Sequence, residues 1–180
     1  NDIWALDLET QTWVRPEIEG QEHFMSKRFH TANTIKDTMI VTFGGCHIEY
    51  HHINELNLFD LTGFLQNPKL NKVICTKINQ TKNVPSTRWG HGAAVYENTK
   101  LLVLGGRNDI DVSDLHQFDI ETGEWTELAI AHPLPKPRRR ASVILVSNCL
   151  VMFGGFDGEF FNDMNVLSLK DDVKATHIEE

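Results

Sequence analysis

The sequence predicts an all-β fold made of repeated antiparallel sheets, and three observations predict it. Its apolar residues come in short β-branched or aromatic runs, which turn residues such as Asn98 separate from one another. No stretch of the sequence sustains the period of a helix. The same markers recur at a period of about 50 residues, which is typical of repeat folds.

The first marker is a glycine pair that ends an apolar run, and it occurs three times at spacings of 61 and 49 residues. A side chain at the end of such a strand would meet the neighbouring sheet, and glycine also adopts the positive φ of a sharp exit. We therefore assign a structural role to Gly44, Gly45, Gly105, Gly106, Gly154 and Gly155.

The second marker is a pair of polar residues five positions apart. It occurs at Asp2 and Asp7, Glu55 and Asp60, Asp114 and Asp119, and Asp163 and Ser168. The first and third copies continue as Glu-Thr-x-x-Trp and end at Trp13 and Trp125. Because an indole offers a large apolar face, we expect both tryptophans to fill the gap between adjacent sheets.

The third marker precedes each glycine pair by 14 residues, at His30, His91 and Arg140, the last standing where the histidine would be. Further arginines cluster just upstream of it, at Arg28, Arg88, Arg138 and Arg139.

In their order, R-x-x-H-x-A, apolar run, Gly-Gly, D-x-x-x-x-D and E-T-x-x-W, the markers resemble the kelch repeat over essentially the whole chain. The resemblance implies a kelch-type β-propeller fragment with four-stranded antiparallel blades. The second repeat departs from the pattern, because it has no tryptophan after Asp60 and carries an insertion near residues 65–71.

Residues 1–180 then form a single partial propeller of about three and a half blades. The blades are expected at 1–16 for the outer half of the first, at 27–78, at 88–128, and at 138–178 with a last strand near 173–178. Propellers close with roughly 4 to 8 blades, so we expect completion by further sequence of the same gene product, a second copy or another partner. The chain starts in the middle of a blade and without Met, which favours a piece of a longer chain.

Composition narrows the function classes. The 25 acidic and 17 basic residues give a net charge of -8 and a pI near 5.6, which argues against nucleic-acid binding. No apolar run approaches the roughly 18 residues that span a bilayer, so no membrane partner is predicted. Three cysteines without C-x-x-C spacing favour a reducing, cytoplasmic setting.

In propellers that resemble this one, the loops entering the innermost strands and the loops after the glycine pairs share a face that commonly captures a peptide. The resemblance therefore predicts a protein partner on Arg28, Tyr50, Arg88, Trp89, Arg107, Asn108, Arg138, Arg139, Arg140 and Phe160. Arginines beside aromatic rings suit acidic or phosphorylated segments. Alternatively, the arginines at 28, 88 and 138 or 139 are repeat residues that bond to neighbouring backbone.

The sequence shows no catalytic motif, so neither an enzyme nor a cofactor is predicted. His47, His51 and His52 are possible metal ligands, but their spacing matches no closed zinc pattern, and no metal site is predicted. The copper radical oxidases that share this fold need two tyrosines at the hub, and Tyr50 and Tyr96 match neither. Two other functions stay open: an architectural subunit that binds through blade edges, and a regulatory propeller of a larger enzyme such as a kelch-linked phosphatase.

Overall fold

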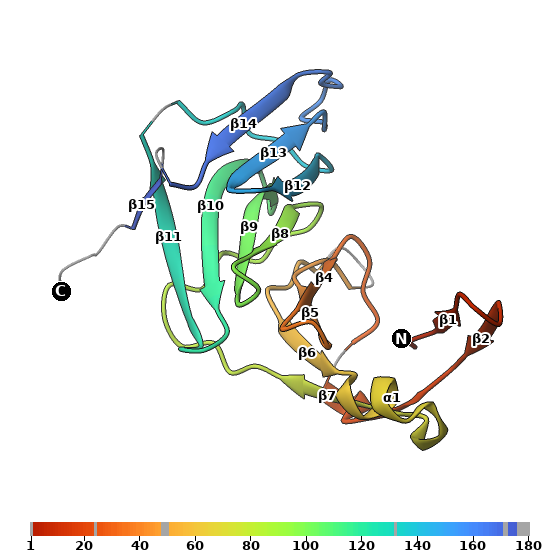
Figure 1. The fold of residues 1–180 in the computed structure, drawn as a ribbon. Coiled ribbons are helices and arrows are strands. Elements are labelled where there is room, and N and C mark those ends of the chain that lie inside the picture. The colour runs from red at the N-terminus through yellow and green to blue at the C-terminus, as the bar shows by residue number, and fades with distance from the viewer. Residues whose placement is uncertain (1, 24, 48–50, 132, 171–172, 176–180) are drawn as a thin grey trace.

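The computed structural model describes residues 2–23, 25–47, 51–131, 133–170 and 173–175. These residues form three mainly antiparallel sheets and a separate hairpin, which follow one another in a curved row (Figure 1). We call the four units blades one to four in chain order. This arrangement is nearly all β, as the sequence predicts.

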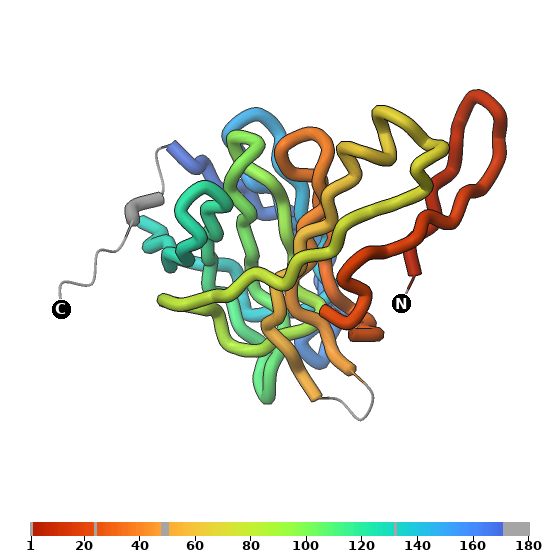
Figure 2. Tube along the Cα trace, turned by 90° about the horizontal axis from the view of Figure 1, so that it is seen from below, coloured from red at the N-terminus to blue at the C-terminus, as the bar shows by residue number. Residues whose placement is uncertain are grey.

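Blade one is the hairpin of β1 (Ala5–Asp7) and β2 (Thr12–Val14). It projects from the body at one end of the row, as the view from below shows (Figure 2). Blade two contains β4 (Thr31–Ile35), β5 (Met39–Phe43), β6 (Leu56–Asp60) and β7 (Lys72–Lys77). A fifth strand, β3 (Glu17–Glu19), pairs with β7 in parallel and is not predicted by the repeat pattern.

The insertion in blade two lies between β6 and β7. It forms a single turn of helix, α1 (Thr62–Gln66), followed by the 3-10 turn η3 (Pro68–Leu70); a further 3-10 turn, η1 (Gln21–His23), follows β3. Among the described residues, no helix has the length and apolar character needed to cross a membrane.

Blade three contains β8 (Gly92–Tyr96), β9 (Lys100–Arg107), β10 (Asp111–Asp119) and β11 (Glu124–Ile130). Blade four contains β12 (Ser142–Val146), β13 (Cys149–Phe153) and β14 (Met164–Ser168). The remaining strand, β15 (Val173–Ala175), pairs with β11 of blade three. The expectation that this segment completes blade four is thus corrected, because the seven-residue β11 offers it an antiparallel edge.

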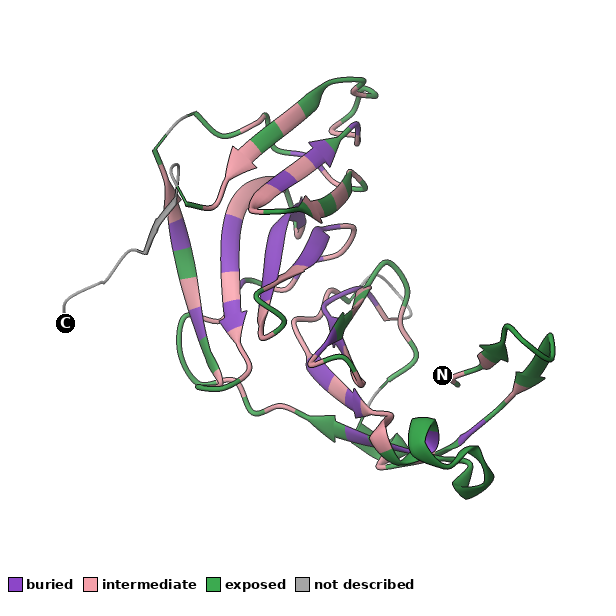
Figure 3. Ribbon diagram, in the orientation of Figure 1, coloured by how far each residue is buried: buried purple, intermediate pink, exposed green. Residues whose placement is uncertain are grey.

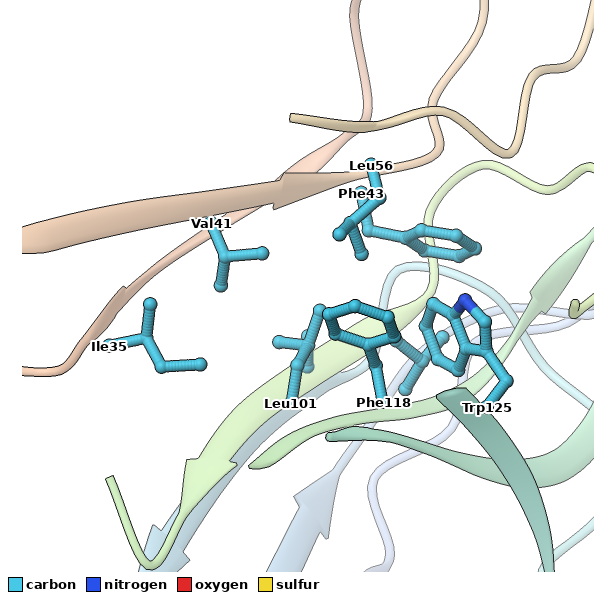
Figure 4. Close-up of a cluster of buried hydrophobic side chains, with 9 residues drawn as sticks. Ile35, Val41, Phe43, Leu56, Leu101, Phe118 and Trp125 are labelled. Carbon is cyan, nitrogen blue, oxygen red and sulfur yellow. The ribbon is translucent and has the colours of Figure 1, made fainter. Parts of the chain in front are cut away.

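The core lies in the seams between blades. Blade two and blade three bury Phe43, Phe118 and Trp125 against one another, with ring centroids of Phe43 and Trp125 4.9 Å apart (Figure 4). Between blades three and four, Leu102 and Leu104 are buried in one cluster with Leu150 and Met152. Buried residues therefore concentrate on the strands of the central sheet (Figure 3).

The two predicted packing tryptophans differ. Trp125 is 1% exposed, and its Nε1 donates to Oε1 of Gln80 at 2.7 Å. Trp13 is 61% exposed, so among the described residues it does not fill a gap between sheets, and that role stays a prediction. The reason is its position, because the described chain places no sheet against that side of the hairpin.

The lengths of the hairpins between the first two strands of each blade change how blade four aligns with the other repeats. Three residues connect β4 to β5 and β8 to β9, whereas two connect β12 to β13. Counted from the strands, Ala141 therefore occupies the position of His30 and His91. Arg140 instead matches Phe29 and Gly90, and all three have positive φ, at 57°, 58° and 62°. Arg140 is thus not a replacement for the repeat histidine.

The glycine pairs lie where both physical reasons for glycine apply. Gly44 has a φ of 61°, and a Cβ there would lie 2.7 Å from the Arg88 carbonyl oxygen. A Cβ on Gly106 would lie 2.8 Å from Cβ of His91. Gly44 thus lets its strand approach the loop that enters the next blade, and Gly106 lets its strand approach the loop that enters its own blade.

Candidate protein-interaction face

The loops that enter blades two, three and four lie side by side on one face of the row. Gly90 N–H donates to the Phe29 carbonyl, and Arg140 N–H donates to the Gly90 carbonyl. Each entering loop also pairs with the residue after a glycine pair, through Arg28 and Cys46, Trp89 and Arg107, and Arg139 and Phe156. Both loop sets therefore meet on this face.

The innermost layer of this face consists of two buried arginines, each paired with a carboxylate that is partly exposed. Arg88 is 0% exposed and donates from Nη1 and Nη2 to the two oxygens of Asp114, at 2.7 Å each, and to the Gly105 carbonyl at 3.0 Å. Arg138 binds both oxygens of Asp163 and the Gly154 carbonyl at 3.0 Å in the same manner. The two pairs occupy equivalent positions in the repeat.

The pKa values of the titratable groups in and beside these ion pairs are strongly shifted. Burial alone would raise the pKa of Asp114, but hydrogen bonds from Arg88 and His116 outweigh it and hold that pKa well below its usual range. The Arg138 guanidinium lowers the pKa of Asp163 to about 2. Burial, aided by the charge of Arg88, lowers the pKa of His91 to about 3, so the imidazole is neutral at pH 7.

The expectation that Arg88 and Arg138 contact a partner is therefore corrected. Both guanidinium groups are turned inward, and their hydrogen bonds go to carboxylates and backbone carbonyls of their own blades. This geometry favours the alternative interpretation, in which these two arginines are repeat residues that bond to neighbouring backbone.

Above this layer lies a set of aromatic and arginine side chains that we call the aromatic–arginine cluster. Its members are Phe29, Trp89, Arg139, Arg140, Phe156 and Phe160. The rings of Phe29 and Trp89 are 5.3 Å apart, and the Arg140 guanidinium lies 4.6 Å from the first and 5.2 Å from the second. The cluster thus joins all three entering loops.

Arg139 is the more constrained arginine of the cluster. Its guanidinium lies 4.6 Å from the Phe156 ring and binds both oxygens of Asp111 at 2.7 and 2.6 Å. Arg107 donates to the same carboxylate at 2.9 Å. Two arginines therefore share a single, largely buried carboxylate, and the group keeps one net positive charge.

Arg140 differs in two respects. It is exposed, and among the described residues no carboxylate forms an ion pair with it. Its φ of 57° lies in the left-handed region, which costs a residue with a side chain on the order of 1 kcal/mol relative to glycine. Gly90, its counterpart in blade three, has the same backbone conformation without that cost.

The other predicted site residues have varied positions. Arg28 lies 5.6 Å from the Phe29 ring, at the edge of the cluster. Asn108 holds its own loop, since its Oδ1 accepts from Ile110 N–H and its Nδ2 donates to Ser86. Phe160 is 89% exposed, with its ring 4.9 Å from Phe156. Tyr50 lies outside the described residues.

The described histidines after the first glycine pair do not form a metal-binding cluster. In the described part of the chain, no three His, Cys, Asp or Glu side chains lie where they could hold a metal ion. The His52 ring instead lies 6.3 Å from Trp89, and His47 N–H donates to the His51 carbonyl.

Phe29 and Asp111 belong to the face but were not predicted. Phe29 stands between two recognised markers, Arg28 and His30, and its equivalence to Gly90 could have identified it. Asp111 carries no repeat signal, because it lies outside the five-residue acid spacing.

A cavity of about 480 Å³ lies elsewhere, between the hairpin and blade two. Trp4, Lys27, Ile40 and Phe59 line it, and none of the predicted site residues does. Lys27 occupies the repeat position of Arg88 and donates to Asn57 Oδ1 at 3.1 Å, and burial lowers its pKa to about 8. We assign no ligand to this cavity.

Antiparallel blades that follow one another, with their loops converging on one face, define the class of repeat β-propellers. Comparison with known proteins gives the family. The chain belongs to the kelch-repeat family, because the family model described as the KLHDC2/KLHL20/DRC7 Kelch-repeats domain matches residues 1–155. It is a protein-interaction module of that family.

Relatives include the host cell factor homolog hcf-1 of Caenorhabditis elegans, 26% identical over 87% of this chain, and acyl-CoA-binding domain-containing protein 4 of Arabidopsis thaliana, 30% identical over 93%. Kelch repeat-containing protein 2 of Saccharomyces cerevisiae is 27% identical over 86% of the chain. The chain spans only 22%, 26% and 18% of the lengths of these three relatives, respectively.

Proposed function

We propose that the aromatic–arginine cluster captures an acidic or phosphorylated segment of a partner protein. The observation that supports this proposal most strongly is the environment of Arg140. Its guanidinium is exposed, lies against the rings of Phe29 and Trp89, and has no carboxylate partner among the described residues. The aromatic platform orients the guanidinium, which leaves its planar fork open to a carboxylate or phosphate.

The neighbouring group extends the same chemistry. Arg107 and Arg139 share Asp111, so a second anionic group of the partner can be bound where two guanidiniums face one carboxylate. Phe160, which is highly exposed, offers an apolar contact beside them. A segment with two acidic groups and an apolar residue fits this arrangement best.

Backbone strain supports a binding role for Arg140. The chain keeps a large side chain in a left-handed conformation at a position where Gly90 shows that glycine fits. Strain of this kind is commonly kept at functional sites.

The test compares binding with stability. Fluorescence anisotropy would measure the affinity of labelled peptides rich in Glu, of the same peptides with phosphoserine, and of lysine-rich counterparts. We expect Arg140→Gly to weaken binding of the acidic peptides at least tenfold, which is about 1.4 kcal/mol. The control is Arg15→Gly, which removes an exposed arginine near the hairpin and should leave binding unchanged.

Two outcomes would contradict the proposal: equal binding of lysine-rich peptides, or wild-type affinity in the Arg140→Gly variant. A stronger response to phosphoserine than to Glu would identify the phosphorylated segment as the partner chemistry. Either acidic source should bind less tightly as salt rises, because the contacts are exposed.

We further propose that this module binds without catalysis and works in a reducing, cytoplasmic setting. Its three cysteines are free thiols, two of them buried, which is compatible with such a compartment. Regulation of an enzyme in a longer protein would use the same face.

A further inference from the structure

One carboxylate of the proposed binding face is not explained by the repeat. Asp111 lies three residues before the first acid marker of its blade, where blades two and four carry His52 and Phe160. All three residues pair with the residue that follows a glycine pair, so they occupy equivalent positions. Because the same pairing forms with a histidine or a phenylalanine, the fold does not require the carboxylate of Asp111.

The residue opposite Asp111 also differs between blades. Arg107 stands where the other two blades have Cys46 and Phe156. It donates from Nη1 to Oδ2 of Asp111 at 2.9 Å, and Nη1 of Arg139 donates to both carboxylate oxygens at 2.7 and 2.6 Å. Among the three described loops of this kind, an arginine therefore faces a carboxylate across the loop in blade three alone.

The hydrogen bonds to Asp111 are less favourable than those in the inner layer. Arg88 holds Asp114 through two parallel bonds, one from each terminal nitrogen. Arg139 instead uses one nitrogen for both oxygens of Asp111, so this pair lacks the fork geometry that strengthens a bidentate contact. An external anion can therefore compete with Asp111 more easily than with Asp114.

The group is accessible, and its carboxylate lies at the end of a strand. The side chain of Arg107 is 34% exposed and that of Arg139 is 15% exposed, so an anion can reach both from solvent. Strand β10 begins at Asp111, and its register against β9 is interrupted between Val112 and Leu115. The Asp111 side chain can therefore turn toward water without disturbing the regular part of the sheet.

The charges around Asp111 favour an anionic ligand. Arg107, Arg139 and Asp111 together leave one net positive charge. The guanidiniums of Arg139 and Arg140 lie 5.5 and 5.2 Å from the same Trp89 ring, so a further positive charge is close. Releasing Asp111 would expose donors that suit a group with several acceptor oxygens, which both carboxylates and phosphates provide.

We infer that Asp111 is an internal ligand of Arg107 and Arg139, and that an anionic group of the partner displaces it. This inference rests on the proposed function, because the same cluster binds the partner. Asp111 makes the face selective, since an incoming group must bind the two arginines better than the internal carboxylate does. Segments with little negative charge are excluded by this competition, while Arg140 is available for the first contact.

The experiment compares Asp111→Asn with a control that removes the same charge from the same face. Asp157→Asn is that control, because Asp157 forms its ion pair with Lys136. Fluorescence anisotropy would measure binding of peptides that carry two glutamates or two phosphoserines. We expect Asp111→Asn to tighten binding at least fivefold and Asp157→Asn less than twofold. A larger gain with phosphoserine would identify phosphate as the displacing group, and a larger gain with glutamate would identify a carboxylate.

A second measurement needs no peptide. Asp111→Asn leaves two arginines without their carboxylate, so inorganic phosphate should raise its unfolding midpoint more than that of the wild type or of Asp157→Asn. Both gains should disappear when Arg139→Gln is added, because that change removes the donor that Asp111 occupies. If Asp111→Asn folds too poorly for measurement, Asp111→Ser serves as the second variant.

Three results would overturn the inference. They are unchanged or weaker peptide binding by Asp111→Asn, equal gains in Asp111→Asn and Asp157→Asn, and a phosphate effect no larger than in the control. Failure of the proposed function looks different, since it gives wild-type affinity in Arg140→Gly or equal binding of lysine-rich peptides. The phosphate measurement separates the two, because it reports on Arg107 and Arg139 without any peptide.

Discussion

Arg138 and Arg140 stand two positions apart on one loop, and their environments are opposite. Arg138 is buried and binds a carboxylate and a carbonyl of its own blade, as Arg88 does one blade earlier. Arg140 is exposed on two aromatic rings and strained in its backbone. The position within the repeat, and not the residue type, separates the inner ion pairs from the proposed binding face.

Because of this difference, the two layers should contribute differently to the free energy of unfolding. The guanidinium groups of the inner pairs are buried, so removing a carboxylate partner leaves an uncompensated charge inside the protein, and removing an arginine breaks a network of hydrogen bonds. Arg140 remains in contact with water, so its removal should change what the face attracts more than it changes folding.

The largest effect is expected from breaking an inner pair. Arg88→Gln leaves Asp114 without its bidentate partner and should lower the free energy of unfolding by about 3–5 kcal/mol. Urea unfolding followed by tryptophan fluorescence measures it. A loss below about 1 kcal/mol would mean that the inner layer does not hold the hub.

A smaller loss of stability is expected when a side chain is added to a glycine that packs against the loop of Arg88. Gly44→Ala places a Cβ 2.7 Å from the Arg88 carbonyl oxygen at a φ of 61° and should cost about 1–3 kcal/mol. Gly123→Ala is the matched control, because Gly123 has a φ of 75° but a Cβ added there would meet nothing within 4 Å. The difference in unfolding free energy isolates the clash, and equal losses would leave backbone strain as the whole cause.

The inner layer should also be sensitive to acid. The pKa of His91 is lowered to about 3 in the folded state, whereas an unfolded histidine titrates near 6.5. The unfolded chain therefore takes up this proton first as the pH falls, and stability should decrease between pH 6.5 and 3 by up to about 1.4 kcal/mol per pH unit. Below pH 4, the lowered pKa values of Asp114 and Asp163 add a further loss.

Urea unfolding at several pH values from 7.5 to 4.5 would measure this slope. His91→Gln should reduce it, since glutamine does not titrate. A slope that is the same in the variant and the wild type would show that His91 is not its source.

The smallest effect on stability is expected in the outer layer. Arg140→Gly relieves the left-handed strain and removes only exposed contacts, so the free energy of unfolding should stay within about 0.5 kcal/mol of wild type or rise slightly. The same unfolding assay checks it. A loss comparable to that of Arg88→Gln would erase the distinction between the layers.

The repeat markers predict the strands and the family because each marker is local in sequence. The second acids show this, since the Oδ1 atoms of Asp7, Asp60 and Asp119 each accept a backbone N–H of the following turn. The first acids are different. Asp114 and Asp163 were recognised as markers, but their partners lie 25 or 26 residues away, and spacing alone does not reveal such a pair.

The repeat markers also do not predict the register of the strands or the burial of individual side chains. Counting 14 residues back from a glycine pair fails for Arg140, because the hairpin of blade four is one residue shorter than its counterparts. Trp13 and Trp125 have the same local motif, yet among the described residues only Trp125 is buried between two blades. Both differences depend on tertiary structure. A repeat pattern in the sequence does not show which blades pack against one another.

The most direct test of the binding face is photo-crosslinking with an acidic peptide that carries a benzophenone, followed by mass spectrometry of the crosslinked fragments. We expect crosslinks to the entering loops at 28–29, 89–90 and 139–140 and to the loop at 156–160, all lost when excess unlabelled acidic peptide competes. Crosslinks confined to the β1–β2 hairpin or to strands β12, β13 and β14 of blade four would contradict the assignment of the binding face.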